Sequence, residues 1–570
     1  MVDVTGTTTW TYNDADEVTQ IAQPNGTISY EWRDNGQPKK RTEPGSITVT
    51  FGYDSYGRPT TTTRADSSWN DTTTIAYDSY GRPLTKTLDN TTKEHYEYDS
   101  LSRLNKVMVK NSAGTTTLRS QNWVYDGVGN MTSRTIEGVT TTYSYDNIHQ
   151  LITESRSGLL LEYTYDANGN RLSKTLNSGT PSTYTYADDD RLLTTPHGTI
   201  TYDAAGRPTA YPTASGTKYF SWDYDDRLLG YSNTSGGTYV EAHKYNGAGA
   251  RVEFSSGGTT RKDLRTGIGV TAPVVSSAVG GSTTVSYLPG IAEKRGSTKS
   301  YQHSGLKNVD AQSNASAAIS ATREYDAFGG VITGSGTTGT FNGPFGHAGD
   351  FGYQSEGSGL QLLGHRWYDP EVGRFLTPDP IQDGKNWFAY CDNNPLGRVD
   401  PAGLFYWPSL PDTDVRNDTG KPIVIIWDGA DGNTYEGTLS AGNWLDNGID
   451  YDWYLAGFTK DGRPIWRKLR QSCTNILTKN KDGSVGVELT FTTFFGGLAE
   501  AVYHGPGSSE YIGSGSKDGG KYYPPGFNGN RRPKPGGGLG KKPSGGSGVS
   551  LPPPSQTRNG WHPTGGQRYE

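Results

Sequence analysis

Polar and apolar side chains alternate along much of the first 255 residues. In the segment Thr141-Thr142-Tyr143-Ser144-Tyr145, the two tyrosines fall on one side of an extended chain and the small residues between them on the other. A period of two residues is typical of a β-strand, whereas an amphipathic helix needs apolar residues three and four positions apart. No long stretch of the chain shows that helical spacing. The pattern therefore predicts an all-β protein in which helix is scarce.

A turn motif of the form Tyr-Asp-x-x-Gly-Arg separates the alternating segments. The Asp side chain accepts hydrogen bonds from the backbone ahead of it and Gly tolerates a positive φ, so each copy predicts the turn of a β-hairpin. Since one hairpin cannot bury its own face, we expect neighbours to stack edge to edge into a long sheet that curls. Because the motif recurs in every unit, we interpret its Tyr and Asp as packing and turn residues, not as a ligand site. The clearest copies begin at Tyr53, Tyr77, Tyr98, Tyr125, Tyr165 and Tyr202, and looser ones at Tyr12, Tyr30, Tyr145, Tyr186, Tyr224 and Tyr245, mostly 20 to 24 residues apart.

Composition narrows the classes of function. The chain has 77 Gly and 37 Tyr but only 3 Met, which suits short strands joined by tight turns. Its net charge of −6 over 570 residues gives no argument for nucleic acid or an anionic membrane as a partner of the whole chain. Only Cys391 and Cys473 are present, so a disulfide framework is excluded and reduced structural thiols are expected. No apolar run is long enough to predict a membrane span.

The first ten residues, MVDVTGTTTW, read as part of a repeat. They contain no basic residue and no apolar stretch, so they predict no signal peptide. We therefore expect a partial member of a longer protein.

The regular Tyr-Asp spacing lapses in residues 256–322. This Gly/Ser/Thr-rich segment keeps strand-like pieces, and we expect an irregular continuation of the repeat sheet. His303 has no second His or Cys at ligand spacing, so we predict no metal site, and no cofactor motif is present.

Three Asp-Pro steps lie among the aromatic residues of segment 363–404, at Asp369, Asp379 and Asp400. A Pro restricts the residue before it to extended geometry, which fixes the direction of each carboxylate. Asp379 and Asp400 are 21 residues apart, and a fold-back would place both in a largely apolar pocket. Two such carboxylates share one proton, one pKa rises, and the pair can act as acid and base on a peptide bond. The alternative is that all three Asp-Pro steps are turns that close the curled sheet, and we adopt it for Asp369.

These motifs together resemble a known family. The Tyr-Asp-x-x-Gly-Arg units resemble the YD repeats of the Rhs/YD-repeat family, and residues 345–404 resemble its Rhs repeat-associated core. The core match includes Gly364-His365-Arg366-Trp367-Tyr368-Asp369-Pro370, Gly373-Arg374-Phe375-Leu376 and Asp400-Pro401-Ala402-Gly403-Leu404. The resemblance implies a hollow β-shell, here a partial cocoon because about a dozen units are few for a closed one. In toxin members of the family, such a shell encloses a C-terminal toxin segment.

The resemblance also implies self-cleavage. Carried over to this chain, Asp379 and Asp400 are the catalytic pair and the scissile bond joins Leu404 to Phe405. Arg366 and Arg374 are candidates to orient the carboxylates or to stabilise an oxyanion.

This chain departs from the family pattern at three places. Gln382 stands where the first Asp-Pro element usually has Gly, and the spacer between the two elements is one residue short. Leu306-Lys307-Asn308 stands where family members usually have Leu-Gly-Ser.

The segment after Leu404 differs in character from the repeats. Residues 405–512 read as a small β-rich domain, and residues 513–570 as a Gly/Pro-rich tail that we expect to be disordered. The tail carries nine Lys or Arg against two acidic residues, a net +7, which favours nucleic acid or another acidic partner, although a solvated low-complexity tail has the same composition. Catalytic motifs are absent. His504 is the candidate general acid/base, although a lone His is more often structural.

The leading hypothesis is a bacterial polymorphic-toxin carrier, a β-shell that holds and proteolytically releases its own C-terminal effector. Such a protein is expected to be secreted or cell-surface through a dedicated secretion system, with an immunity protein and a shell-completing partner. The alternatives are a non-enzymatic cell-surface or adhesion scaffold and a truncated inactive remnant.

Overall fold

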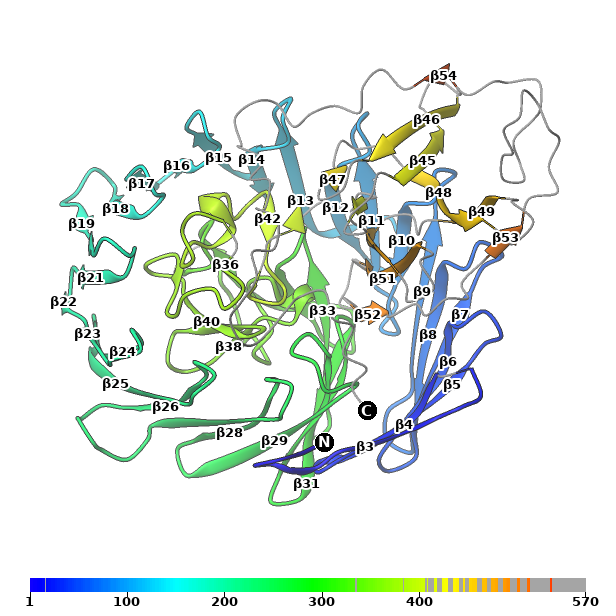
Figure 1. Ribbon diagram of the computed structural model, residues 1–570, viewed down its shortest axis with the longest axis horizontal. Helices are drawn as coiled ribbons and strands as arrows, with labels where there is room; N and C mark the ends of the chain where they lie inside the picture. The colour runs from blue at the N-terminus through cyan, green and yellow to red at the C-terminus, as the bar shows by residue number, and fades with distance from the viewer. Residues whose placement is uncertain are drawn as a thin grey trace.

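The computed structural model is built of β-strands joined by tight turns (Figure 1). It describes residues 1–15, 17–333, 336–382 and 384–404, and beyond them only the backbone of short strands. Within this described part, the helical elements are two 3-10 turns, η1 (Gly349–Phe351) and η2 (Cys391–Asn393). The prediction of an all-β protein with little helix is confirmed.

Each Tyr-Asp-x-x-Gly motif forms the turn of a hairpin, as predicted. In the turn between β7 (Ile47–Tyr53) and β8 (Pro59–Ala65), the Gly57 amide donates to the Asp54 carbonyl oxygen at 3.1 Å. The Asp54 Oδ1 atom accepts the amides of Tyr56 and Arg58, both at 2.9 Å. Gly57 has a φ of +78°, which explains the Gly of the motif.

The Tyr of each motif ties one hairpin to the hairpin before it. The Tyr77 hydroxyl donates to the Pro59 carbonyl oxygen at 2.6 Å, and its ring lies 4.5 Å from the Arg58 guanidinium of the preceding turn. Tyr98 repeats both contacts with Pro83 and Arg82. This ladder of rings supports the interpretation of the motif as scaffold.

Consecutive hairpins form one antiparallel sheet of seventeen strands, in which each strand pairs with the next along the chain. Its strands are β3 (Thr9–Tyr12), β4 (Val18–Gln23), β5 (Gly26–Trp32), β6 (Pro38–Glu43), β7, β8, β9 (Asp71–Tyr77), β10 (Pro83–Thr87), β11 (Lys93–Tyr98), β12 (Leu104–Lys110), β13 (Thr117–Tyr125), β14 (Met131–Ile136), β15 (Val139–Tyr145), β16 (Leu151–Arg156), β17 (Leu159–Tyr165), β18 (Arg171–Leu176) and β19 (Ser182–Thr183). The short pair β1 (Val2–Asp3) and β2 (Gly6–Thr7) precedes it.

A three-stranded sheet and then a 13-stranded sheet continue in the same way. The first contains β20 (Thr185–Tyr186), β21 (Leu192–Thr195) and β22 (Gly198–Thr199). The second contains β23 (Thr201–Tyr202), β24 (Pro208–Thr213), β25 (Gly216–Trp222), β26 (Leu228–Ser232), β27 (Glu241–Tyr245), β28 (Arg251–Ser256), β29 (Thr259–Arg265), β30 (Val274–Val279), β31 (Ser282–Leu288), β32 (Ala292–Arg295), β33 (Thr298–Ser304), β34 (Val309–Ser313) and β35 (Ile319–Thr322). Residues 256–322, where the Tyr-Asp spacing lapses, thus contain regularly paired strands.

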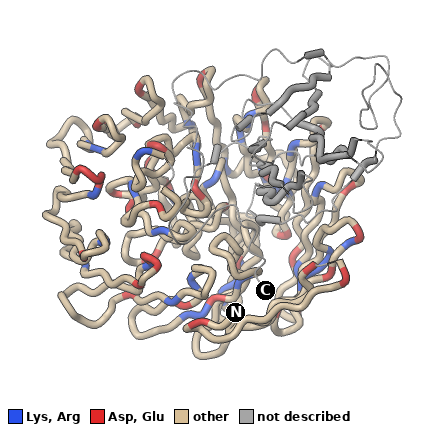
Figure 2. Tube along the Cα trace, in the orientation of Figure 1, with Lys and Arg blue, Asp and Glu red and all other residues tan. Residues whose placement is uncertain are grey.

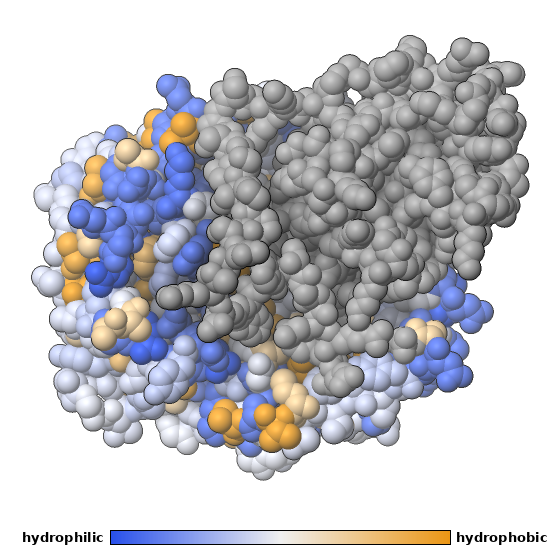
Figure 3. All heavy atoms as spheres, viewed as in Figure 1, coloured by the Kyte–Doolittle hydropathy of each residue, from blue (hydrophilic) through white to orange (hydrophobic). Residues whose placement is uncertain are grey.

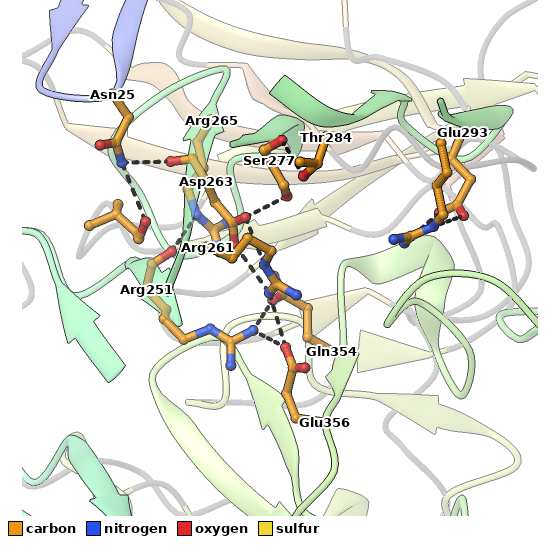
Figure 4. Close-up of polar contacts among 12 residues, drawn as sticks. Asn25, Arg251, Arg261, Asp263, Arg265, Ser277, Thr284, Glu293, Gln354 and Glu356 are labelled. Atoms are coloured by element: carbon orange, nitrogen blue, oxygen red, sulfur yellow. Dashed lines mark hydrogen bonds and ion pairs between the residues drawn. The ribbon is translucent and has the colours of Figure 1, made fainter. Parts of the chain in front are cut away.

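The strands curl until the start of the chain meets β28 and β29 (Figure 1). Asn25 donates through Nδ2 to the carbonyl oxygens of Asp263 at 3.0 Å and Val252 at 3.3 Å, and Gln23 donates to that of Arg265 at 2.7 Å. Figure 4 shows Asn25 reaching across this seam. The predicted curling of the sheet is confirmed.

Residues 324–404 lie inside the curl and form what we call the core segment (Figure 1). Its strands are β36 (Glu324–Tyr325), β37 (Val331–Ile332), β38 (Gln354–Ser355), β39 (Gln361–Leu363), β40 (Arg366–Asp369), β41 (Arg374–Phe375) and β42 (Arg398–Val399). Its Phe328 and Leu396 pack on inward-facing residues of the repeats, among them Tyr143 and Tyr163, and Trp367 packs on a second such group.

Polar contacts fix the core segment to the turns of the repeats. Asn386 donates to Asn170 Oδ1 at 2.7 Å, and Asn393 donates to the Gly169 carbonyl oxygen at 2.7 Å. Elsewhere, Arg261 joins Asp263 of the shell to Glu356 of the core segment, at 3.0 and 3.1 Å (Figure 4). The core segment is thus docked onto the turn that follows Tyr165 and, elsewhere, onto β29.

The outer face of the described part is mixed in character. Acidic and basic residues of both signs are distributed around the shell (Figure 2), and apolar side chains are scattered between polar ones on the visible face (Figure 3). The described residues include no helix long and apolar enough to cross a membrane.

Beyond residue 404 the strand bounds are β43 (Trp407–Pro408), β44 (Val415–Asn417), β45 (Ile423–Asp428), β46 (Thr434–Leu439), β47 (Trp444–Leu445), β48 (Tyr451–Phe458), β49 (Pro464–Lys468), β50 (Cys473–Lys479), β51 (Val485–Thr492), β52 (Glu500–Val502), β53 (Glu510–Ile512) and β54 (Lys534–Pro535). The expected disorder of 513–570 and the side chain of His504 lie outside the described residues.

Candidate functional site: an aspartate pair in the core segment

Asp379 and Asp400 each begin a turn of the kind seen in the repeats. The Gly403 amide donates to the Asp400 carbonyl oxygen at 3.2 Å, and the Gln382 amide donates to that of Asp379 at 3.0 Å. The Asp400 Oδ1 atom also accepts the amide of Leu404 at 3.0 Å, as Asp54 accepts the amides ahead of it. The two Asp-Pro elements are therefore turns of the Asp-x-x-Gly kind in which the Asp side chain is buried.

Both carboxylates converge on Arg366 of β40. Its Nη2 atom lies 3.4 Å from Asp379 Oδ2 and 3.2 Å from Asp400 Oδ2. The Arg366 Nη1 atom donates to the Trp387 carbonyl oxygen at 2.9 Å, and the guanidinium lies 3.7 Å from the centre of the Phe375 ring. One guanidinium, held by a carbonyl and a ring, therefore brings the predicted pair together.

The pair is shielded from water. Asp379 is 4% exposed, Asp400 2% and Arg366 4%. Tyr353, which follows η1, holds the backbone of Asp400 at both ends: its hydroxyl donates to the Asp400 carbonyl oxygen at 2.7 Å and accepts the Asp400 amide at 2.9 Å. No motif in the sequence singled out Tyr353, because its role depends on a contact across 47 residues.

Burial raises the pKa of Asp400 to about 7, although Arg366 and the Leu404 amide act to lower it, and the nearby Asp379 raises it further. Burial likewise lowers the pKa of the Arg366 guanidinium. Because Asp400 titrates near neutrality beside a second carboxylate, the pair can hold one proton and one negative charge at neutral pH. That is the protonation state in which one carboxyl acts as acid and its partner as base.

The chain just after Asp400 is held against the pair. The Arg366 Nε atom donates to the Gly403 carbonyl oxygen, and the Leu404 amide donates to Asp400. Leu404 thus lies beside a candidate acid. Phe405, the other half of the predicted scissile bond, lies outside the described residues.

The departure at Gln382 does not disrupt its turn. Gln382 is exposed and has a φ of +57°, and Gly403 at the equivalent place has a φ of +65°. A Cβ at Gly403 would lie 2.2 Å from the Leu363 carbonyl oxygen, so only glycine fits there. Gln382 adopts the left-handed backbone at a cost of about 1 kcal/mol. The short spacer also leaves both carboxylates within reach of Arg366.

We expected Arg374 beside the two carboxylates, but its guanidinium contacts the repeats instead. Its Nη1 atom donates to Asn170 Oδ1 at 3.2 Å and its Nη2 atom to the Asp190 carbonyl oxygen at 2.6 Å. The guanidinium also lies 4.8 Å from the Tyr186 ring. Arg374 therefore docks the core segment onto the repeats, because its side chain leaves the short strand β41 toward the shell.

Asp369 is a turn residue, as interpreted from the sequence. Its carbonyl oxygen accepts the Gly373 amide at 2.7 Å, and its Oδ1 atom accepts the Glu371 amide at 2.8 Å. The other carboxylate oxygen accepts the Tyr211 hydroxyl of the repeats at 2.7 Å.

The other residues considered for chemistry have structural partners. His303 is buried and contacts Glu94 and Ser313, each at 2.8 Å. In the described part, no group of three His, Cys, Asp or Glu residues is arranged to hold a metal ion. Cys391 is a buried free thiol whose pKa is raised by burial, and the Cys473 side chain lies outside the described residues.

Comparison with known proteins identifies the repeats. The family model described as RHS Repeat matches residues 32–68. The chain is 29% identical over 283 residues to the "tRNA3(Ser)-specific nuclease WapA" of Bacillus spizizenii, a match covering 46% of this chain and 12% of that protein. It is 26% identical over 324 residues to "Double-stranded DNA deaminase toxin A" of Burkholderia cenocepacia, covering 50% of this chain and 22% of that protein. The chain thus matches only a fraction of these relatives' length.

Solved structures show the same fold. The crystal structure of TcdB2-TccC3-Cdc42 superposes with a TM-score of 0.56 at 18% identity, covering 71% of this chain and 23% of the other. A Tc holotoxin pore of Photorhabdus luminescens superposes with a TM-score of 0.54 at 18% identity, covering 66% of this chain and 21% of the other. The RHS Repeat match and the repeat turns that continue its pattern along the shell identify this chain as one that contains RHS repeats, and it is similar over about half its length to the two proteins named above.

Proposed function

We propose that this chain is the carrier part of an Rhs-type polymorphic toxin, in which the β-shell encloses a C-terminal effector and the core segment releases it by cutting after Leu404. The observation that carries the proposal is the convergence of Asp379 and Asp400 on Arg366, at 3.4 and 3.2 Å, with the Leu404 amide 3.0 Å from Asp400.

In the proposed reaction the pair acts once, in cis. The ionised carboxylate takes a proton from a water molecule as the water oxygen attacks the Leu404 carbonyl carbon. The protonated carboxyl then gives its proton to the Phe405 nitrogen as the C–N bond breaks. Arg366 stays charged and stabilises the negative charge on the pair.

The shell supports the carrier role. Its sheet curls until the first hairpins meet β28 and β29, and the core segment lies inside the curl, held to the repeat turn that contains Gly169 and Asn170. The cargo in this proposal is residues 405–570. The relatives' names, a tRNA nuclease and a DNA deaminase toxin, favour nucleic acid as its target, which the basic tail would contact and for which His504 is the candidate acid/base. An immunity protein, a shell-completing partner and secretion to the cell surface or beyond belong to the same proposal.

Denaturing gels and intact mass spectrometry of the purified chain test the cleavage. Wild type is expected to give two fragments, residues 1–404 and 405–570, and Asp379→Asn and Asp400→Asn are expected to stay full length. Asp369→Asn is the matched control, since Asp369 is also a buried Asp before Pro in the core segment. It is expected to cleave like wild type.

A full-length wild-type chain would contradict the self-cleavage and favour the adhesion scaffold or the remnant. Toxicity on expressing residues 405–570 alone, absent for residues 1–404, would distinguish an effector from an adhesin.

A further inference from the structure

Lys307 is a buried lysine with main-chain partners. It follows β33 and is 4% exposed. Its Nζ atom donates to the carbonyl oxygens of Pro395 and Arg398, the latter at 3.0 Å. Burying an ammonium is costly unless its donors are satisfied. The two carbonyls are the groups that satisfy it.

The backbone around Lys307 is itself anchored. Leu306 packs against the hydrophobic cluster that contains Leu396. The Asn308 Oδ1 atom accepts the Ala348 amide at 2.9 Å. Lys307 therefore extends toward the core segment from an anchored connection between β33 and β34.

The carbonyls that Lys307 holds lie just before a member of the aspartate pair. Arg398 begins the two-residue strand β42, which ends immediately before Asp400. Among the described residues, Lys307 has no ion pair with a carboxylate, so its contacts act on the backbone of 395–398. Burial lowers the pKa of Lys307 to about 8, with Cys391 opposing the shift and Arg134 adding to it, so the ammonium form prevails at neutral pH.

We propose that Lys307 is a positioning residue for the aspartate pair: by holding the Pro395 and Arg398 carbonyls, it keeps Asp400 against Arg366 and Asp379. The inference rests on the proposed self-cleavage. It also gives a role to Lys307-Asn308, one of the places where this chain departs from the family pattern.

The test compares Lys307→Met with a matched control, Lys294→Met. Lys294 also donates through Nζ to a carbonyl oxygen, that of Ser68 at 2.9 Å, but it is only partly buried and links two parts of the shell. Two quantities are measured in the full chain: the rate of cleavage after Leu404, and amide hydrogen exchange of peptides from residues 395–404. Exchange is measured in an Asp379→Asn background, so that every chain stays intact.

Lys307→Met is expected to slow cleavage by about 100-fold, as a misplaced group in a catalytic constellation does. It is expected to speed exchange at residues 395–404 by about tenfold while exchange in the repeats stays unchanged. Lys294→Met is expected to change neither quantity.

Unchanged exchange at residues 395–404 would overturn the positioning role, as would an equal rise throughout the shell, which would mark Lys307 as a general packing residue. Increased local exchange in a chain whose wild type never cleaves would support the positioning role and overturn only the self-cleavage. If Lys307→Met fails to fold, Lys307→Gln replaces it, since one amide group reaches at most one of the two carbonyls. It is expected to give an intermediate rise, and exchange equal to the parent would overturn the inference.

Discussion

The repeat turn at Asp54 and the core turn at Asp400 are built alike but titrate in opposite directions. In the repeat, Asp54 is half-buried and its Oδ2 atom accepts Arg58 Nε of the same turn at 2.7 Å. Partial burial raises the pKa of Asp54, but the Arg58 guanidinium and the amides of Arg58 and Tyr56 outweigh it and hold the pKa below its usual value.

The core turn lacks an arginine of its own. Leu404 occupies the place that Arg58 has in the repeat, and Asp400 shares Arg366 with Asp379. Because burial then prevails, the pKa of Asp400 rises to about 7. One kind of turn therefore lowers or raises the pKa of its Asp, depending on burial and on whether that Asp has a cation to itself.

Replacing Arg366 or Arg58 is expected to give the largest difference in stability between the core turn and the repeat turn. Arg366→Met removes the guanidinium that the two buried carboxylates share, which is expected to cost about 3–5 kcal/mol and to abolish cleavage. Arg58→Met removes a pair near the surface and is expected to cost about 1 kcal/mol or less. Urea unfolding and gel-detected cleavage of both variants measure the contrast. Equal losses of stability would contradict it.

Cleavage is expected to depend on pH through the pair. The shared proton of the pair is lost as pH rises through about 7, the pKa of Asp400. The rate should therefore be high near pH 6 and fall on passing to pH 8, as measured by gel time courses after refolding. A rate that rises steadily with pH would exclude the carboxyl of Asp400 as the acid.

The two turns are expected to lose their contributions to stability in opposite directions of pH: the core turn as pH rises and the repeat turn as pH falls. The raised pKa of Asp400 means that its contribution to stability is present at low pH and is lost as pH rises through about 7. The lowered pKa of Asp54 means that its contribution is present at neutral pH and is lost as pH falls below its usual range. Between pH 6.5 and 7.5, urea midpoints should fall for wild type and fall less for Asp400→Asn. An equal fall would assign the effect to other buried carboxyls, such as Glu154 and Asp350, whose pKa values burial also raises to about 7.

Substitutions at the positive-φ position of each turn are expected to change stability by a smaller amount, and in opposite directions in the two regions. Gln382→Gly relieves a positive φ in the core and is expected to stabilise by about 1 kcal/mol. Gly57→Ala places a Cβ at a φ of +78° and is expected to destabilise by a similar amount, about 1 kcal/mol. The urea midpoint should rise for Gln382→Gly and fall for Gly57→Ala. A destabilising Gln382→Gly would show that the Gln382 side chain makes a compensating contact.

Removing one hydrogen bond of the tyrosine ladder is expected to have the smallest effect on stability. Tyr77→Phe removes the hydroxyl that donates to the Pro59 carbonyl oxygen and is expected to cost about 1 kcal/mol or less. Tyr56→Phe is the control, because Tyr56 is 81% exposed at the tip of its turn. The thermal midpoint of Tyr77→Phe should be lower than that of Tyr56→Phe. Identical midpoints would show that the hydroxyl of the tyrosine ladder does not stabilise the shell.

Much of this fold could be read from the sequence because its signals are local. A period of two between Asp-x-x-Gly turns specifies hairpins, and the hairpins specify the sheet. The pairing of Asp379 with Asp400 was expected from two Asp-Pro steps in an aromatic-rich segment and from a motif resemblance. The parts that sequence reasoning missed depend on long-range contacts: Tyr353 reaches Asp400 across 47 residues, and Arg374 turns toward Asn170 across 204. Nothing in the neighbouring sequence encodes either direction.

The most direct test of the central claim is the intact mass of freshly purified wild-type chain beside Asp400→Asn. If the pair cuts the chain, wild type separates into residues 1–404 and 405–570 under denaturing conditions, while Asp400→Asn keeps the mass of residues 1–570. A single full-length mass for wild type, or cleavage after Leu404 in Asp400→Asn, would contradict the claim that burying a repeat-type turn has made its Asp an acid that cuts the chain.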